Sequence, residues 1–162
     1  MQVLLEILSK LIICEVMKEL AWEIAETARM MRRFYDRRAS ALGVTSAQWR
    51  VLAWLSRESG LKQVELAERL DVEPITACRI IDRLEEAGLV ERQRDPDDRR
   101  AWRLVLTARA EPIVIKLRAL AEDMAGDAFD GFALEEVDAI RAKLARVRDN
   151  VTKAEAATRV SA

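Results

Sequence analysis

The sequence predicts a mainly α-helical protein that contains one small β-hairpin. Alanine, leucine, glutamate and arginine dominate, whereas glycine and proline number only 5 and 3 in 162 residues, a composition that favours helix. Apolar residues recur at spacings of three and four along most of the chain, as they do on one face of a helix. Residues 89–107 differ, because alternating apolar positions there surround an Asp-Pro-Asp-Asp turn sequence. The length suits one domain with its own core.

The composition argues against several function classes. The net charge is −1, so the total charge gives no indication of nucleic-acid binding, and any basic surface must come from where the charges lie. There is no histidine, which removes the commonest general base and metal ligand. Cys14 and Cys78 have no CxxC neighbour, so a zinc site is poorly supported and the free thiols suit a reducing cytoplasm. Without a glycine-rich phosphate loop, we expect neither an enzyme nor a cofactor.

The first 42 residues are expected to form one or two helices over about 3–41, with a break at Leu42-Gly43. The opening segment is apolar but interrupted by charges, so it is too polar for a membrane span and lacks the features of a signal peptide. It is better explained as an amphipathic helix that needs a partner to cover its apolar side. Both Met1 and Met17 remain open as the natural start.

Three shorter helices are expected next. Thr45-Ser46-Ala47-Gln48 is a capping box that begins a helix over about 45–59, and Gly60 ends it. A second helix covers about 62–70. Pro74 suits the first turn of a third helix over 74–87, although Lys62 and Glu73 are weak N-cap residues.

The helix over 74–87 has two different faces. Its apolar stripe, which should be buried, consists of Ala77, Ile80, Ile81 and Leu84. The other face presents Ile75, Thr76 and Arg79 near the start of the helix, with Arg83 beside them. Such a leading edge can read base edges in a major groove. The alternative for Arg79 is a weak pairing with Asp82 on the same helix.

Two strands are expected at about 89–94 and 101–107, with a charged tip between them. Trp102, Leu104 and Leu106 share one parity and should anchor the second strand to the rest of the domain. From residue 79 to residue 103 there are seven arginines and seven acids, so the local charge sum is zero. In one interpretation the tip touches DNA; in the other it is a solvated turn whose charges pair with each other.

Two more helices complete the chain. One should run over about 108–130, capped by Thr107 and kinked by Pro112 in its first turns. The other should cover 134–151, and residues 152–162 are expected to form a flexible tail. The long helices at either end of the chain carry more apolar surface than the small central domain can cover.

This order of elements describes a winged helix-turn-helix. The motifs Leu66-Ala67, Asp82-Arg83-Leu84-Glu85, Gly88-Leu89-Val90, Asp95-Pro96-Asp97-Asp98-Arg99-Arg100 and Leu106-Thr107 resemble those of the MarR family of bacterial transcription regulators. The resemblance covers about residues 20–150. Trp49, Glu73 and the run Ala110-Glu111-Pro112-Ile113 are similar to the SlyA-like branch of that family.

The resemblance implies a homodimer that binds palindromic double-stranded DNA, as a repressor. Dimerisation helices over 1–42 and 108–151 would flank a winged head over 43–107, with the tail at 152–162. Arg100 would enter the minor groove, steadied by Asp98. Thr76 and Arg79 would read bases, Ile75 would touch a thymine methyl group, and Arg83 belongs to the same surface. The expected phosphate contacts are Arg94, Arg99 and Arg103.

The SlyA-like branch further implies a pocket for a small aromatic effector, either a phenol or an aryl carboxylate, between head and dimerisation helices. Trp49 matches its apolar wall and Arg29 would be its basic partner. The alternative places Trp49 in the core and Arg29 on the surface. Cys14 is either a thiol sensor or an ordinary apolar cysteine. The alternative for the whole protein is a winged-helix protein-interaction module without specific DNA binding.

Overall fold

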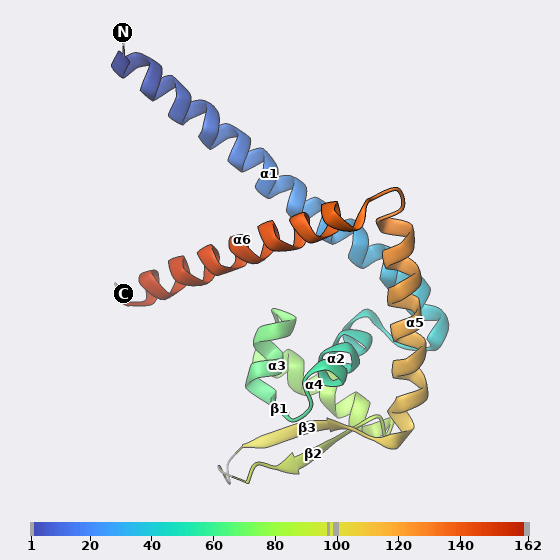
Figure 1. The fold of residues 1–162 in the computed structure, drawn as a ribbon. Coiled ribbons are helices and arrows are strands. Elements are labelled where there is room, and N and C mark those ends of the chain that lie inside the picture. The colour runs from blue at the N-terminus through green and yellow to red at the C-terminus, as the bar shows by residue number, and fades with distance from the viewer. Residues whose placement is uncertain (1, 97, 99–100, 161–162) are drawn as a thin grey trace. The chain divides into compact units, whose positions relative to one another are not determined.

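The computed structural model describes residues 2–96, 98 and 101–160, and the side chains of 12–96, 98 and 101–158. The chain forms two compact units, one ending at Met124 and the other starting at Ala125. The helices and strands, labelled in Figure 1, are α1 (Gln2–Ala39), α2 (Ser46–Arg57), β1 (Leu61–Lys62), α3 (Gln63–Leu70), α4 (Pro74–Glu86), β2 (Val90–Arg94), β3 (Trp102–Leu106), α5 (Glu111–Ala128) and α6 (Leu134–Val160).

The expected first break and the capped helix after it are confirmed. A 3-10 turn, Ser40–Leu42, follows α1, and Gly43 then adopts a left-handed conformation with φ 75°. The Gln48 amide donates to Thr45 Oγ1 at 3.3 Å, and the Thr45 amide donates to Gln48 Oε1 at 3.0 Å. This reciprocal pair satisfies two amides that the first turn of α2 leaves without helical partners. The helix ends at Arg57, two residues before the expected end.

The helix-turn-helix consists of α3, a tight turn and α4. Lys62 does not cap α3 with its side chain; instead, its amide donates to Glu65 Oε2 at 2.7 Å. Asp71 ends α3 in a left-handed conformation, and α4 begins at Pro74 as predicted. The predicted apolar stripe of α4 is confirmed, because Ala77, Ile81 and Leu84 are fully buried and Ile80 is half-buried.

The predicted hairpin forms, but the sheet has three strands rather than two. The strand order is β1-β3-β2, and every pairing is antiparallel. In β1, Leu61 lies opposite Leu104 and Lys62 opposite Arg103, and the Gly60 amide donates to the Leu104 carbonyl at 3.0 Å. Two residues are too few to show alternation, which is why the sequence did not reveal this strand.

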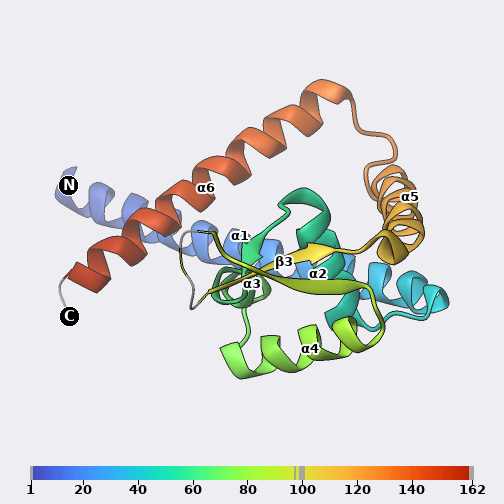
Figure 2. The ribbon, with the colours of Figure 1, turned by 90° about the horizontal axis from the view of Figure 1, so that it is seen from below.

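The core of the head lies between the sheet and the three short helices. Figure 1 shows α2, α3 and α4 gathered beside the sheet, and in Figure 2 α4 lies at the edge of the head. Leu104 is fully buried and Leu106 is half-buried, as expected. The prediction for Trp102 is wrong, because its side chain is 37% exposed and packs with Arg94 instead of with the core. The largest fully buried side chains are Leu52, Leu55, Leu66, Leu70, Ile81, Leu84, Leu104, Val51 and Val90.

The junction between head and α5 also differs from expectation. Thr107 does not cap a helix, because its hydroxyl donates to the Gly88 carbonyl at 2.6 Å. A 3-10 turn, Ala108–Ala110, follows, so Pro112 is the second residue of α5. A proline in that place gives up no helical hydrogen bond. Beyond it, the buried Tyr35 hydroxyl donates to the Leu117 carbonyl at 2.7 Å and so joins α1 to α5.

The second unit consists of the end of α5 and the whole of α6. Phe129 and Phe132 meet edge to face at 5.9 Å between ring centres, and the Ala133 amide donates to Glu136 Oε2 at 2.9 Å where α6 begins. The helix continues to Val160, through most of the segment predicted to be a flexible tail. Residues 152–160 include several alanines and no glycine or proline, so nothing local stops the helix. No helix within the described residues is long and apolar enough to cross a bilayer.

Candidate nucleic-acid interface

The outward face of α4 carries the predicted reading residues. Ile75 is 62% exposed, and Thr76, Arg79 and Arg83 are also exposed. Among the residues that the structure describes, Arg79 and Arg83 form no ion pair or side-chain hydrogen bond. The alternative pairing of Arg79 with Asp82 is not seen, because Asp82 binds Arg92. Two guanidinium groups and an apolar side chain therefore share one outward surface.

An arginine on β2 holds α4 against the sheet. The Arg92 guanidinium binds Asp82 at 2.5 Å and also binds the Glu85 carboxylate, while the Arg92 amide donates to Glu85 Oε1 at 3.3 Å. Burial of the guanidinium opposes its charge, but hydrogen bonds and attraction from the two carboxylates outweigh that effect and raise the pKa of Arg92. One guanidinium thereby faces both acids of this cluster and offsets the charge of one of the two carboxylates.

A buried carboxylate holds the tip end of the hairpin. Asp95 is only 3% exposed, although its neighbours along the chain are exposed. Its Oδ2 lies 3.0 Å from Arg103 Nε and 3.6 Å from Lys62 Nζ, and its Oδ1 accepts from the Asp98 amide at 3.1 Å. The turn closes through backbone bonds from the Asp95 amide to the Ala101 carbonyl and from the Ala101 amide to the Asp98 carbonyl. Sequence reasoning assigned Asp95 only to the turn.

The predicted wing cations lie in different settings. The Arg94 guanidinium stacks over the Trp102 ring at 4.2 Å from its centre. Arg103 is half-buried beside Asp95. Arg99 and Arg100 lie outside the described residues, and so does the expected support of Arg100 by Asp98. Asp98 itself is exposed.

The zero charge sum of this region does not describe its surface. Of the seven acids between residues 79 and 103, Asp82, Glu85 and Asp95 form ion pairs inside the head. Arg79 and Arg83, in contrast, point outward from α4. The three paired acids engage Arg92, Arg103 and Lys62, and the other described acids of the same stretch, Glu86, Glu91 and Asp98, are exposed. Arg79 and Arg83, which form no ion pair with a described residue, are the charges that α4 offers to a DNA backbone.

Trp49 lines a pocket, but Arg29 does not. The Trp49 ring packs against Tyr35 with 4.2 Å between ring centres, and its Nε1 donates to Asp36 at 2.7 Å. The pocket has a volume of about 270 Å³, and its two arginines are Arg32 and Arg57. Arg29 is exposed and binds Glu26 through its Nε at 2.8 Å, an interaction that lowers the pKa of that carboxyl. The guanidinium groups beside Trp49 therefore come from other arginines than the predicted one.

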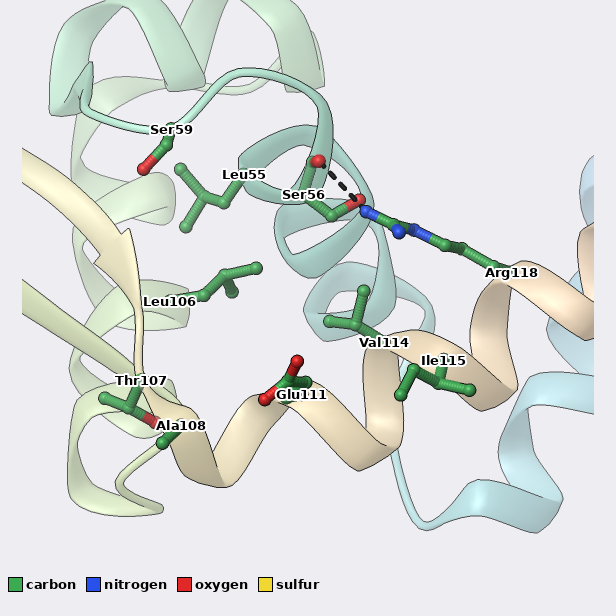
Figure 3. Close-up of a pocket in the computed structure, with 10 residues that line it drawn as sticks. All are labelled: Leu55, Ser56, Ser59, Leu106, Thr107, Ala108, Glu111, Val114, Ile115 and Arg118. Atoms are coloured by element: carbon green, nitrogen blue, oxygen red, sulfur yellow. Dashed lines mark hydrogen bonds between the residues drawn. The ribbon is translucent and has the colours of Figure 1, made fainter.

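A second pocket of about 380 Å³ lies where α2, β3 and α5 meet (Figure 3). Leu55, Leu106 and Val114 form its apolar wall, and the Arg118 guanidinium donates to the Ser56 carbonyl at 3.2 Å. Figure 3 shows the Glu111 side chain directed toward the middle of this group. The pocket contains neither of the two pocket residues that the sequence predicted.

The two cysteines have unlike surroundings. Cys14 is exposed on α1, and Cys78 is half-buried on α4, where Gln63 Nε2 lies 2.6 Å from its sulfur. Within the described part of the chain, no three cysteine or acidic side chains gather as metal ligands would.

Comparison with known proteins agrees with this geometry. The model of the MarR family matches residues 44–102, which span α2 to the start of β3. The crystal structure of the transcriptional regulator PA3341 is 36% identical and superposes with a TM-score of 0.75, covering 80% of this chain and 96% of that one. A crystal structure of MarR is 32% identical, with a TM-score of 0.66 and coverage of 83% and 98%.

Two further similar structures are those of SlyA and of a MarR protein complexed with operator DNA. The transcriptional regulator SlyA is 26% identical, with a TM-score of 0.72 and coverage of 83% of this chain and 94% of that one, which supports the predicted SlyA-like branch. A mutant MarR from E. coli, complexed with operator DNA, is 27% identical, with a TM-score of 0.68 and coverage of 79% and 92%. With its winged head and these relatives along most of its length, the chain belongs to the MarR family of transcriptional regulators.

Proposed function

We propose that this protein is a sequence-specific DNA-binding repressor that acts as a homodimer on a palindromic operator. The observation that carries the proposal is the outward pair Arg79 and Arg83 on α4, a helix held in place by the Arg92 cluster. The operator complex of E. coli MarR, a protein with the same fold, supports it. Relatives of this family are transcription regulators, which gives no reason to expect an enzyme.

Each outward residue of α4 has a role in this proposal. Thr76 and Arg79 lie near the start of the helix and would hydrogen-bond to base edges, while Ile75 would contact a thymine methyl group. Arg83, one turn further along, would contact a phosphate. The free amides at the start of α4 add a positive dipole end for the backbone.

The hairpin would supply contacts beside those of α4. Arg94 is held over Trp102, and Arg100 and Arg99 remain the proposed minor-groove and phosphate contacts. Arg103 uses its Nε for Asp95, but a guanidinium has five N–H donors, so that bond is compatible with a phosphate contact. Asp98 remains the proposed support of Arg100.

A second copy of the chain would cover the apolar face of α1. Ile13, Val16, Met17 and Leu20 lie on one side of this helix, and each is more than half exposed. A monomer rarely leaves such a continuous apolar surface in water. Two copies would place two heads on half-sites about 34–36 Å apart, as expected for a palindrome.

The pocket beside Trp49 is the proposed effector site. Tyr35 and Trp49 offer aromatic walls, and Arg32 and Arg57 offer guanidinium groups for a carboxylate or phenolate. An aryl acid bound there would release DNA if it favours a dimer geometry in which the heads cannot span both half-sites.

The test is selection of bound duplexes from a random DNA pool, followed by fluorescence anisotropy at several salt concentrations. We expect an enriched palindrome and an affinity that falls steeply with salt, because each phosphate contact releases counterions. Analytical ultracentrifugation should give a dimer. Failure to bind any duplex at low salt would refute the proposal and favour the protein-interaction module.

A further inference from the structure

We propose that Asp95 is the positioning residue that fixes the hairpin to the helix-turn-helix, so that both can contact DNA at once. The inference rests on the proposed DNA-binding function, and it assigns to Asp95 the support of the whole wing rather than of one side chain. The starting observation is the burial of Asp95. At 3% exposure, it is the only charged residue that is buried among those whose side chains the structure describes.

The described partners of Asp95 come from three different places. The Asp98 amide belongs to the turn, and Arg103 belongs to β3. Lys62 belongs to β1 and immediately precedes α3, so it stands at the start of the helix-turn-helix. One carboxylate therefore joins the turn, the outer part of the hairpin and the beginning of α3.

The middle and the outer end of β2 are fastened differently. Arg92, in the middle of the strand, binds α4 through Asp82 and Glu85. Asp95, just beyond the end of the strand, binds Arg103 of β3 and Lys62 of β1. The Arg92 cluster thus fixes β2 to α4, and Asp95 connects the outer end of β2 to β3 and to the start of α3. Without Asp95, the hairpin would keep its connection to α4 but lose its connection to the start of α3.

A carboxylate is needed at this position. Its Oδ1 accepts from an amide while its Oδ2 faces two cations, so both oxygens act as acceptors. An asparagine has nearly the same shape, but its NH₂ group would face either a cation or an N–H donor. Because an unpaired donor in a buried site is costly, Asp95→Asn should release at least one of the described partners Lys62, Arg103 and the Asp98 amide.

The first experiment compares two acid-to-amide variants on the selected operator. Asp95→Asn and Glu91→Gln each remove one negative charge from the hairpin, and Glu91 is an exposed residue of β2 that binds only Gln93 among the described residues. Charge alone predicts tighter DNA binding by both variants. We expect Asp95→Asn instead to bind roughly tenfold more weakly, in the range of a lost specific contact, whereas Glu91→Gln binds at least as tightly as the natural protein.

The footprint separates the wing from the recognition helix. Hydroxyl-radical protection outside the bases covered by α4 should disappear in Asp95→Asn, while the central protection remains. An Asp95→Asn protein that binds as tightly as the natural one, with its full footprint, overturns the inference.

The second experiment needs no DNA. Hydrogen exchange of the Asp95 and Ala101 amides, which close the turn, should be faster in Asp95→Asn and unchanged in α4. If that variant does not fold, Lys62→Gln replaces it, because the Lys62 side chain is 40% exposed and its replacement removes only one connection. Unchanged exchange in the hairpin overturns the inference. If the natural protein binds no DNA but exchange is still faster in Asp95→Asn, the proposed function is refuted and the role of Asp95 in fixing the hairpin stands.

Discussion

The cluster of Arg92, Asp82 and Glu85 allows a quantitative prediction about how β2 holds α4. Arg92→Met removes the guanidinium but keeps an apolar stem of similar length. Arg92 is 19% exposed, whereas the side chains of Asp82 and Glu85 are 54% and 41% exposed, so solvent screens both carboxylates. Each ion pair should therefore contribute about 0.5–1 kcal/mol, and the variant should lose about 1–2 kcal/mol in all.

Urea denaturation followed by circular dichroism measures this loss as a shift of the midpoint at constant slope. The control is a double-mutant cycle in which Asp82→Asn and Glu85→Gln are combined with Arg92→Met. If the ion pairs act as described, the combined variant should lose about 1–2 kcal/mol less than the sum of the separate losses. Strictly additive losses would refute this account of the cluster.

Three further predictions concern α1, α2 and the DNA-binding surface. Tyr35→Phe removes the hydroxyl that donates to the Leu117 carbonyl and should cost about 1 kcal/mol in the free energy of unfolding. Burial raises the pKa of Tyr35 above its ordinary value of 10.0, so the stability that the neutral hydroxyl contributes is present at lower pH and is lost as the pH rises through the folded-state pKa. The free energy of unfolding of Tyr35→Phe should therefore fall less steeply with pH in the alkaline range. An equal dependence on pH in both proteins would contradict this. Thr45→Ala should lower stability by about 1 kcal/mol in thermal or urea unfolding, since it removes the capping hydroxyl, and Thr45→Ser should restore it. Arg79→Ala and Arg100→Ala should each weaken operator binding by about 1–3 kcal/mol in gel shift, and an unchanged affinity would remove that residue from the interface.

Local signals in the sequence predicted the elements whose cause is local. The capping box at Thr45, the proline at the start of α4 and the glycine after Leu42 each act within one turn of chain, so the pattern alone located them. The apolar stripe of α4 was equally accessible, because burial follows the helical period. The outward placement of Arg79 follows from the same geometry.

Features that depend on distant residues were not accessible in this way. The strand β1 forms by pairing with β3, where Leu61 lies opposite Leu104, and the cations beside the buried Asp95, Lys62 and Arg103, come from other strands. Thr107 has a favourable cap sequence, but the Gly88 carbonyl, 19 residues away, takes its hydroxyl. Predicting β1 and the burial of Asp95 would have required the register between strands. Predicting the role of Thr107 would have required its contact with Gly88 across the hairpin.

Tyr35 has a consequence for how the chain could respond to a small molecule. Its ring packs on Trp49 of α2, its hydroxyl holds the Leu117 carbonyl of α5, and its backbone belongs to α1. The same side chain forms part of the wall of the pocket beside Trp49. A compound that enters this pocket therefore meets a residue at which three helices are joined. A rotation of α1 relative to α5 would break or remake the Tyr35 hydrogen bond, and a rotation of the head relative to α1 would change the contact between the Tyr35 and Trp49 rings. Tyr35 would therefore be a spectroscopic reporter of the proposed effector binding.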